Sequence, residues 1–530
     1  MENLFIEKGI QASNETLSEE GALKYTTTGN EFVDDFASIS KYKEPRSYED
    51  VSKTMQTLYS IDPIKAIKMI LYIRLITRKT QIVTNGQVEV LETQRGTGLK
   101  HESIMRMLWL AKNHTPDFKE NLPLFIVAGS WKDVFTLLLD MPSTMYEYMF
   151  SIIEAGLINS ATTELVRKYL PTIQSKPTTE RAKRRTYIGK QLAQFLFPNV
   201  GKFTAYKCYR HLKAAGIAHK WQQLISKQLY DKIDFNTIAG RALSLLVGSK
   251  FLRNHNLTEK YSAWIASKPE VKCTSFVFEV FTLLDKNDGE SYVEDTVNAQ
   301  FAQLVKTGKE NINTNSRLLA VLDTSGSMQG RALGCNVSSY TIAKAMGIYF
   351  SEFLTGAFAN TYAEFSRTCV LKKWEGDTPA QKWMENDLED YGSTNFQSVI
   401  GLFIKLKEKG VPETDFPTGI LCLSDGEFDG CYKHTNFETA ILRLSEGGFS
   451  KEYVDNFRII LWDIPNTFYS TRPAPKFESS ANDSNFFYLS GYDPSIVSFV
   501  LEGKSPKTAK ELMEIALNQE LLHRVAHVNL

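Results

Sequence analysis

The arrangement of apolar residues changes at about residue 316. Beyond it the chain alternates between apolar runs of strand length ("RLLAVLD", "TYAEFS", "TGILCLSD", "FRIILWDI") and stretches of helical spacing ("SSYTIAKAMGIYFSEFL", "NFQSVIGLFIKLKEKG", "FETAILRLSEGG"). Strands that alternate with helices form a mostly parallel sheet, because each parallel connection has to cross over the sheet. We therefore predict a Rossmann-like α/β domain with its functional loops at the carboxyl ends of the strands.

Before this point, from about residue 48 to residue 301, the pattern is helical nearly throughout. Segments such as "DPIKAIKMILYIRLITRK", "HESIMRMLWLAKNH" and "SWKDVFTLLLD" carry apolar residues at intervals of three and four. Pro63, Pro116, Pro123 and Gly129 mark short turns between such segments, which favours stacked helix pairs. No strict repeat period is visible, so we predict an irregular, HEAT-like helical-repeat array and leave open whether it closes into a ring.

These patterns divide the 530 residues into five segments and predict a multidomain protein of class α plus α/β. We expect a partly extended N-terminal segment at 1–40, the helical module at 41–305 and a polar linker at 306–316. The α/β domain is expected at 317–504. A C-terminal helix that docks back on one of the domains is expected at 505–530, opening at Ser505-Pro506.

The cysteines and the apolar runs limit the class of protein. No stretch reaches ~18 uninterrupted apolar residues, and the start of the chain has no basic region followed by an apolar one, so neither a membrane span nor a secretion signal is expected. The six cysteines form no C-x-x-C pair, which argues against a disulfide framework and a zinc knuckle. We expect a cytoplasmic protein with free thiols and no membrane partner.

Oxygen-bearing residues follow the ends of several predicted strands. Asp323, Ser325 and Ser327 come directly after the first strand of the α/β part, in "DTSGSMQG"; Thr394 in "DYGSTNF" and Asp425 in "LCLSDGEFDG" follow later elements. Three hydroxyls and two carboxylates are hard oxygen donors, which Mg²⁺ prefers in octahedral geometry while keeping several waters. The sequence therefore predicts a site for Mg²⁺ or another divalent cation such as Mn²⁺ or Ca²⁺.

Two other interpretations of "DTSGSMQG" lack the glycines that they need. A nucleophile elbow requires G-x-S-x-G, but Asp323 stands two positions before Ser325, and Ser325 two before Ser327. A phosphate-binding P-loop requires G-x-x-x-x-G-K-[ST]. The nearest match ends in Gly503-Lys504-Ser505 but has Ser498 where the first glycine belongs.

Other acidic and histidine residues are assigned ordinary roles. Glu427 and Asp429 are expected to form a solvated acidic loop rather than direct metal ligands. His523 and His527 have ligand-like spacing, but Arg524 stands where a zinc protease places its glutamate, so we expect a surface pair.

The sequence also bears on catalytic activity. A metal with open positions could aid phosphoester hydrolysis, but the sequence shows no general acid, general base and nucleophile that converge on one site. We therefore predict no catalytic residues and no enzymatic activity.

The charges are balanced over the whole chain but not along it. Lys and Arg number 61, as do Asp and Glu. Residues 161–220 hold 13 basic and 2 acidic residues, a net charge of +11, whereas residues 317–505 hold 17 basic and 24 acidic residues, a net charge of −7. This asymmetry indicates an anionic partner for the first segment and a cation or basic partner for the second.

The basic segment also contains aromatic residues. Tyr187, Phe203, Tyr206 and Tyr209 lie among its cations; aromatic faces can stack unpaired bases at ~1–3 kcal/mol each, and cations neutralise phosphates. This mixture fits single-stranded ends or loops of RNA better than a duplex. A solvated helix face above core aromatic residues is the alternative. The predicted RNA-binding residues are Arg181, Lys183, Arg184, Arg185, Lys190, Lys202, Lys207, Arg210 and Lys213.

The five oxygen donors also carry a family resemblance. Asp-x-Ser-x-Ser followed by a loop Thr and a strand-end Asp resembles the metal-ion-dependent adhesion site (MIDAS) of von Willebrand factor A (vWA) domains. The resemblance implies that Ser325, Ser327 and Thr394 contact the metal directly. It also implies that Asp323 and Asp425 hold the metal largely through waters, and that one position stays open for a partner's carboxylate.

The helical part resembles the TROVE module of Ro ribonucleoproteins. "TLSEEGALKYTTTGNEFVDDF", "LPLFIVAGSWKDVFTLL", "RKYLPTIQSKP" and "DKIDFNTIAGRALSLLVGSKFLRNH" look like successive blocks of a little-characterised group in plants, fungi, bacteria and large viruses that joins a TROVE-like module to a vWA domain. In the Ro relatives this module is a ring that binds small RNAs. We predict an RNA-binding protein with a Mg²⁺-dependent site for an acidic ligand or protein partner. The alternative is a metal-dependent interaction or assembly factor with no RNA role.

Overall fold

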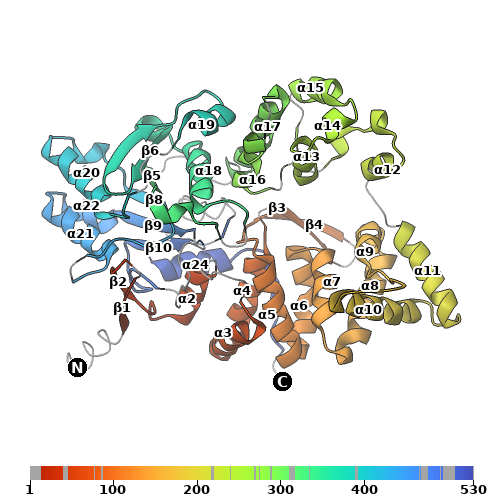
Figure 1. Ribbon diagram of the computed structural model, residues 1–530. Helices are drawn as coiled ribbons and strands as arrows, with labels where there is room; N and C mark the ends of the chain where they lie inside the picture. The colour runs from red at the N-terminus through yellow and green to blue at the C-terminus, as the bar shows by residue number, and fades with distance from the viewer. Residues whose placement is uncertain are drawn as a thin grey trace. The chain divides into compact units, whose positions relative to one another are not determined.

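The computed structural model divides into two compact units, each described by itself below (Figure 1). Unit 1 comprises Met1–Arg46, Arg95–Gly98 and Ala239–Gln519, and unit 2 comprises Ser47–Gln94, Leu99–Ile238 and Glu520–Leu530. This grouping places the last helices of the predicted helical segment in the unit that contains the sheet. The structure describes residues 14–18, 20–39, 46–76, 78–84, 87–215, 220–238, 240–267, 270–271, 273, 275–286, 289–309, 317–332, 335–387, 392–431, 433–464, 466, 476–489, 491–492 and 508–528.

A six-stranded sheet lies in unit 1. Its strands are β5 (Leu318–Asp323), β6 (Thr361–Phe365), β7 (Cys369–Lys373), β8 (Gly419–Ser424), β9 (Arg458–Asp463) and β10 (Phe486–Leu489), in the order β10-β9-β8-β5-β6-β7. All neighbours are parallel except β7, which pairs antiparallel with β6. The predicted Rossmann-like, mostly parallel sheet is therefore confirmed. β7 and β10, which the sequence analysis did not predict, are the short strands at the two edges.

Helices cover the sheet and explain why its central strands are apolar throughout. α18 (Ser339–Ser351) lies on one side, and α20 (Gln397–Glu408), α21 (Asn436–Glu446) and α22 (Lys451–Asn456) lie on the other (Figure 1). Every residue of β5 and β8 is buried, as expected for strands covered on both faces. α21 begins with a capping box, in which the side chains of Thr435 and Glu438 each accept a hydrogen bond from the other's backbone N–H.

The remaining strands and α-helices of unit 1 come from the two ends of the chain and from its middle. They are β1 (Glu15–Leu17), β2 (Leu23–Tyr25), α2 (Glu31–Ser38), α13 (Gly240–Val247), α14 (Phe251–Asn254), α15 (Thr258–Ala266), α16 (Val277–Phe281), α17 (Ser291–Lys309), α19 (Pro379–Glu385) and α24 (Ala509–Leu517). α17 continues through 306–309, where a linker was expected, and 310–316 lie outside the described residues. α24 packs on α2 and β10 and begins after Thr508; Ser505-Pro506 and the rest of 493–507 lie outside the described residues.

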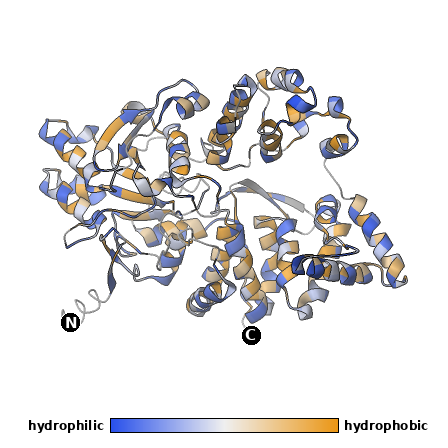
Figure 2. Cartoon of the chain, viewed as in Figure 1, coloured by the Kyte–Doolittle hydropathy of each residue, from blue (hydrophilic) through white to orange (hydrophobic). Residues whose placement is uncertain are grey.

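Unit 2 is built mainly of helices, as predicted. They are α3 (Tyr48–Ile61), α4 (Pro63–Arg74), α5 (Lys100–Asn113), α6 (Thr115–Ala128), α7 (Trp131–Asp140), α8 (Tyr146–Ile158), α9 (Thr163–Tyr169), α10 (Glu180–Leu196), α11 (Lys202–Ala215) and α12 (Lys220–Ser226). Figure 2 shows hydrophobic and hydrophilic residues on different sides of these helices. Within the described part of the chain, no helix is both long and apolar enough to cross a membrane.

A hairpin interrupts the helical pattern, so the prediction of helix is wrong for residues 78–94. β3 (Arg78–Thr84) and β4 (Gln87–Gln94) pair antiparallel, with a register shift between Lys79 and Thr80. The sequence held the signal: Asn85-Gly86, typical of a two-residue hairpin turn, stands between "TQIVT" and "QVEVLET", which are rich in β-branched residues. The turn itself lies outside the described residues.

The last described residues belong to unit 2. The Nδ1 atom of His527 lies 2.8 Å from Oδ2 of Asp117, and the backbone N–H of Val528 donates to Oδ1 of the same carboxylate at 2.6 Å. His527, expected at the surface, is therefore half-buried, whereas His523 is exposed. Burial of Asp117 would raise its pKa, but hydrogen bonds from Tyr59, Val528 and His527 hold that pKa below its ordinary value.

Candidate functional site

The loop after β5 brings three of the predicted metal-site residues together. Oδ1 of Asp323 accepts the backbone N–H of Ser325 at 2.9 Å. The hydroxyl oxygens of Ser325 and Ser327 lie 3.2 Å apart. Two ligands in adjacent octahedral positions, each ~2.0–2.1 Å from Mg²⁺, are separated by ~3 Å. The spacing of the two hydroxyls therefore fits neighbouring positions around one ion.

Hydrogen bonds connect this loop to the loop that carries Thr394, and that loop to the one that carries Asp425. The N–H of Gly326 donates to the carbonyl of Gly392 at 3.3 Å. Thr394 donates its N–H to Oδ1 of Asp429 at 3.0 Å and accepts the N–H of Asp429 at 2.9 Å. The five predicted residues are all buried, and they lie on three connected loops at the carboxyl edge of β5 and β8.

Sequence reasoning missed two residues of this site. The side-chain amide of Asn466 donates to the carbonyl of Ser327 at 2.9 Å and to Oδ2 of Asp425 at 2.8 Å. The hydroxyl of Ser424 donates to Oδ2 of Asp323 at 2.5 Å. Asn466 stands three residues beyond the end of β9, and Ser424 is the last residue of β8. Their positions at the carboxyl ends of predicted strands could have identified both residues from the sequence.

Asp429 also differs from its expected role. Rather than facing solvent in an acidic loop, its carboxylate is half-buried and accepts the backbone N–H of Thr394. The carbonyl of Asp429 in turn accepts the side-chain amide of Asn436 at 2.9 Å. Asp429 therefore orients the loop that carries Thr394, which is compatible with the expectation that it is not a direct metal ligand.

The electrostatics of the site favour a cation. Burial, and then the negative charge of Asp425, raise the pKa of Asp323 to about 7, against hydrogen bonds from Ser325 and Ser424 that lower it. Two repelling carboxylates beside neutral hydroxyls form a donor set that a divalent cation fits. Among the described residues there is no cluster of three or more His, Cys, Asp and Glu side chains that could hold a metal, so this site depends on its hydroxyls.

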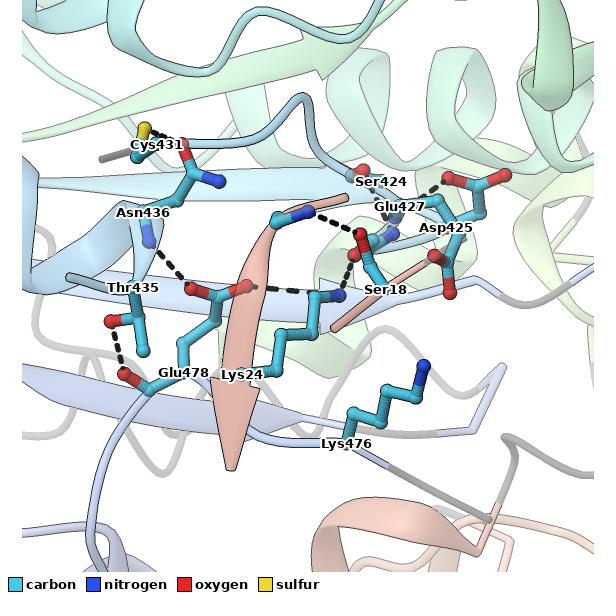
Figure 3. Close-up of polar contacts among 12 residues, drawn as sticks. Ser18, Lys24, Ser424, Asp425, Glu427, Cys431, Thr435, Asn436, Lys476 and Glu478 are labelled. Carbon is cyan, nitrogen blue, oxygen red and sulfur yellow. Dashed lines mark hydrogen bonds and ion pairs between the residues drawn. The ribbon is translucent and has the colours of Figure 1, made fainter. Parts of the chain in front are cut away.

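An N-terminal lysine supports the third loop. The ammonium group of Lys24, on β2, donates to the carbonyl of Gly426 and lies 3.7 Å from Oε1 of Glu478 (Figure 3). The carboxylate of Glu478 also accepts the backbone N–H of Asn436 at 2.9 Å, and its carbonyl accepts the hydroxyl of Thr435 at 2.6 Å. Lys24 is almost fully buried. It therefore connects the segment after Asp425 to the start of α21 by a charge-assisted contact.

The predicted RNA-binding residues lie on α10 and α11, and most are exposed. The exposed ones are Arg181, Lys183, Arg184, Arg185, Lys202, Lys207 and Arg210, and the half-buried ones are Lys190 and Lys213. Arg184 donates to the carbonyls of Leu139 and Met141 at 3.1 and 3.0 Å, at the end of α7. Lys213 donates to the carbonyl of Leu170 at 2.5 Å, at the end of α9. These two cations satisfy helix C-termini, whereas the others are more open to a ligand.

The four aromatic residues of the basic segment separate into two pairs. Phe203 is 84% exposed and Tyr187 49%, but Tyr206 is only 6% exposed and Tyr209 is fully buried. The hydroxyl of Tyr209 donates to the carbonyl of Pro171 at 2.9 Å. Tyr206 and Tyr209 are therefore core residues, as the alternative interpretation required, and Phe203 and Tyr187 present ring surface to solvent.

The chain is similar in part to a family model, a curated protein and a solved structure. Residues 317–527 match the family described as "Domain of unknown function (DUF7788)". An uncharacterized protein of Acanthamoeba polyphaga mimivirus is 21% identical over 309 residues, 56% of this chain and 51% of the relative, so the chain spans about half the length of that curated relative.

Among solved structures, the Deinococcus radiodurans RO (RSR) protein is similar at 13% identity and a TM-score of 0.39, over 79% of this chain and 87% of that one. The family model that matches residues 317–527 describes a domain whose function is unassigned.

Proposed function

We propose that this protein binds RNA on the exposed face of α10 and α11. The observation that carries the proposal is the row formed by Phe203, Lys207 and Arg210, which stand at positions i, i+4 and i+7 of α11 and are all exposed. An exposed phenyl ring beside two cations suits a strand whose bases stack while its phosphates are neutralised. No ion pair connects Lys207 or Arg210 to another described residue.

α10 contributes a second set of cations. Arg181 and Arg185 stand four positions apart and are exposed, and neither is paired with a carboxylate within the described part of the chain. Lys183 differs, because its ammonium group lies 2.6 Å from Glu180. The half-exposed ring of Tyr187 lies on the same helix. Because unpaired bases can reach such rings, the substrate class is a single-stranded end or loop of a small RNA.

The RNA proposal is tested with the full chain and a fluorescently labelled single-stranded RNA at 50–200 mM salt. We expect affinity to fall as salt rises, and Lys207→Gln or Arg210→Gln to weaken binding and reduce the slope of log K against log salt by about 0.7 for each lost phosphate contact. Lys53→Gln, which removes an exposed charge on α3 of the same unit, is the matched control. Absence of salt-dependent binding by the unaltered chain contradicts the proposal.

We also propose that the loops after β5 and β8 hold Mg²⁺ for an acidic ligand, such as a carboxylate of a protein partner. The supporting observations are the 3.2 Å spacing of the Ser325 and Ser327 hydroxyls and the buried Asp323–Asp425 pair. Ser325, Ser327 and Thr394 would contact the ion, and Asp323 and Asp425 would hold it through waters. Neutral direct ligands leave a bound ion with charge to attract an outside acid. This function involves binding and no catalytic step.

The two proposals are separable. If the chain binds Mg²⁺ and an acidic partner but no RNA, it is a metal-dependent interaction factor. Calorimetric titration of the unaltered chain with Mg²⁺ tests the metal site directly. A heat of binding that Asp323→Ala abolishes is the expected result, and absence of any heat contradicts the metal proposal.

A further inference from the structure

A cavity of about 230 Å³ lies among α7, α9, α10 and α11 in unit 2. Its wall contains four cationic side chains, one from each of these helices: Lys132, Lys168, Arg185 and Lys213. Phe135 and Leu139 on α7 supply apolar wall, and none of the lining residues is acidic. The cavity is therefore a concave site with an uncompensated positive charge.

The four cations are free to act on a ligand to different degrees. Lys132 and Arg185 are exposed, and neither forms an ion pair with a described residue. Lys168 is half-buried beside the ring of Tyr169, 5.4 Å from its centre. Lys213 is held by the carbonyls of Lys168 and Leu170. Three of the four ammonium and guanidinium groups thus retain most of their donors.

The charges in this wall repel one another. Burial, and then the positive charge of Arg185, lower the pKa of Lys213. Asp133, the residue after Lys132, does not offset these charges, because its carboxylate is already held by Arg74 at 2.7 Å and Lys100 at 2.6 Å. A ligand with concentrated negative charge would relieve the repulsion.

The chemistry of the wall selects among anions. A phosphodiester inside a strand carries one charge and has chain on both sides, whereas a terminal phosphate carries a charge of about −1.5 to −2 at pH 7, has three free oxygens and can enter a concave site. Lys and Arg groups from four helices, with the exposed Thr172, offer donors to those oxygens. Arg185 belongs both to this wall and to the exposed face of α10.

We propose that this cavity binds a phosphomonoester, the phosphorylated end of an RNA strand. This proposal rests on the RNA binding proposed above and adds the part of the RNA that is recognised. The end enters the cavity, and the strand that follows it lies along the exposed face that begins at Arg185.

The test uses the full chain and one single-stranded RNA sequence in three forms, with a 5′-phosphate, with a 3′-phosphate and with two hydroxyl ends. We expect at least one phosphorylated form to bind about tenfold more tightly than the hydroxyl form, and the two phosphorylated arms identify the end. Millimolar 5′-AMP should remove this preference, because it offers the same phosphomonoester.

Variants of the cavity separate this proposal from general RNA binding. Lys132→Gln and Lys168→Gln should abolish the preference for a phosphorylated end while leaving the affinity for the hydroxyl RNA within about twofold. Lys207→Gln, outside the cavity wall, should weaken all three RNAs equally. Equal binding of the three RNAs by the unaltered chain overturns the end recognition alone. Failure of all three RNAs to bind overturns the proposed RNA function as well.

Discussion

Asn466 donates its side-chain amide to Oδ2 of Asp425 at 2.8 Å, and through the same nitrogen to the carbonyl of Ser327. One side chain beyond β9 therefore orients parts of two loops that the chain separates by about a hundred residues. Such outer contacts orient the residues that hold a metal and commonly account for 10–100-fold of its affinity. Asn466 is fully buried, so bulk solvent does not compete for its amide.

Replacement of Asn466 by Ala should weaken Mg²⁺ binding by about 10–100-fold, because Asp425 loses the donor that orients its carboxylate. Calorimetric titration with Mg²⁺ measures the change. Asn485→Ala removes an amide that also bonds to backbone carbonyls of unit 1, those of Val454 and Phe457, and serves as the control. An unchanged Mg²⁺ affinity in Asn466→Ala would show that the amide has no part in metal binding.

Asp323→Asn should leave the metal-free protein at least as stable as before and reduce the stabilisation that Mg²⁺ provides. The substitution removes the repulsion between two buried carboxylates, so the metal-free protein should be no less stable than the unaltered one. Mg²⁺ at a hundred times its Kd should stabilise the unaltered protein by about 2.7 kcal/mol and the variant by much less. Thermal unfolding with and without Mg²⁺ measures both effects.

Asp377→Asn, at an exposed position of the same unit, provides the control for that measurement and should keep the full Mg²⁺ response. A Mg²⁺-induced rise in Tm of equal size in Asp323→Asn and the unaltered chain would place the ion elsewhere.

Asp133 should make the free energy of unfolding of unit 2 decrease at acidic pH. Burial alone would raise the pKa of this carboxyl, but the charges of Arg74 and Lys100 outweigh burial and hold the pKa below its ordinary value of 3.8. A lowered folded-state pKa contributes stability that is fully present above the unfolded-state value and is lost as the pH falls below it. Asp133→Asn should cost about 3–5 kcal/mol at pH 7, because it leaves Arg74 buried without its partner.

Urea unfolding between pH 7 and pH 3 checks this prediction. The free energy of unfolding should fall less between pH 4 and pH 3 in Asp133→Asn than in the unaltered chain. Parallel pH profiles for the two proteins would mean that this carboxylate keeps the same pKa on unfolding.

Substitutions of Phe203 and Tyr209 should affect RNA binding and protein stability differently. Phe203→Ala should weaken single-stranded RNA binding by about 1–3 kcal/mol and leave the free energy of unfolding nearly unchanged, since the ring is exposed. Tyr209→Phe should do the reverse and cost about 1 kcal/mol of stability, because it removes the buried hydrogen bond to Pro171. Fluorescence anisotropy and urea unfolding measure the two quantities. A loss of stability without a loss of affinity in Phe203→Ala would remove this ring from the proposed interface.

The sequence by itself determined the elements whose signals are local. The spacing of apolar residues predicted the helices of unit 2, because a helix repeats its buried face at a fixed interval. Continuous apolar runs predicted the strands β5, β6, β8 and β9, because strands covered on both faces are apolar throughout. The hairpin β3–β4 was missed, although Asn85-Gly86 in the sequence indicates a hairpin turn. Asp323 and Asp425 could be placed at one edge because parallel strands end together.

Only the tertiary structure decided which side chains meet and which face solvent. Tyr209 and Phe203 stand six residues apart on one helix, yet the first is buried and the second is exposed, because burial depends on the elements packed against each face. The contact of Asn466 with Asp425 and the convergence of four cations from four helices follow likewise from packing. Spacing along the chain sets the direction of a side chain on its own element, and packing between elements sets what that side chain touches.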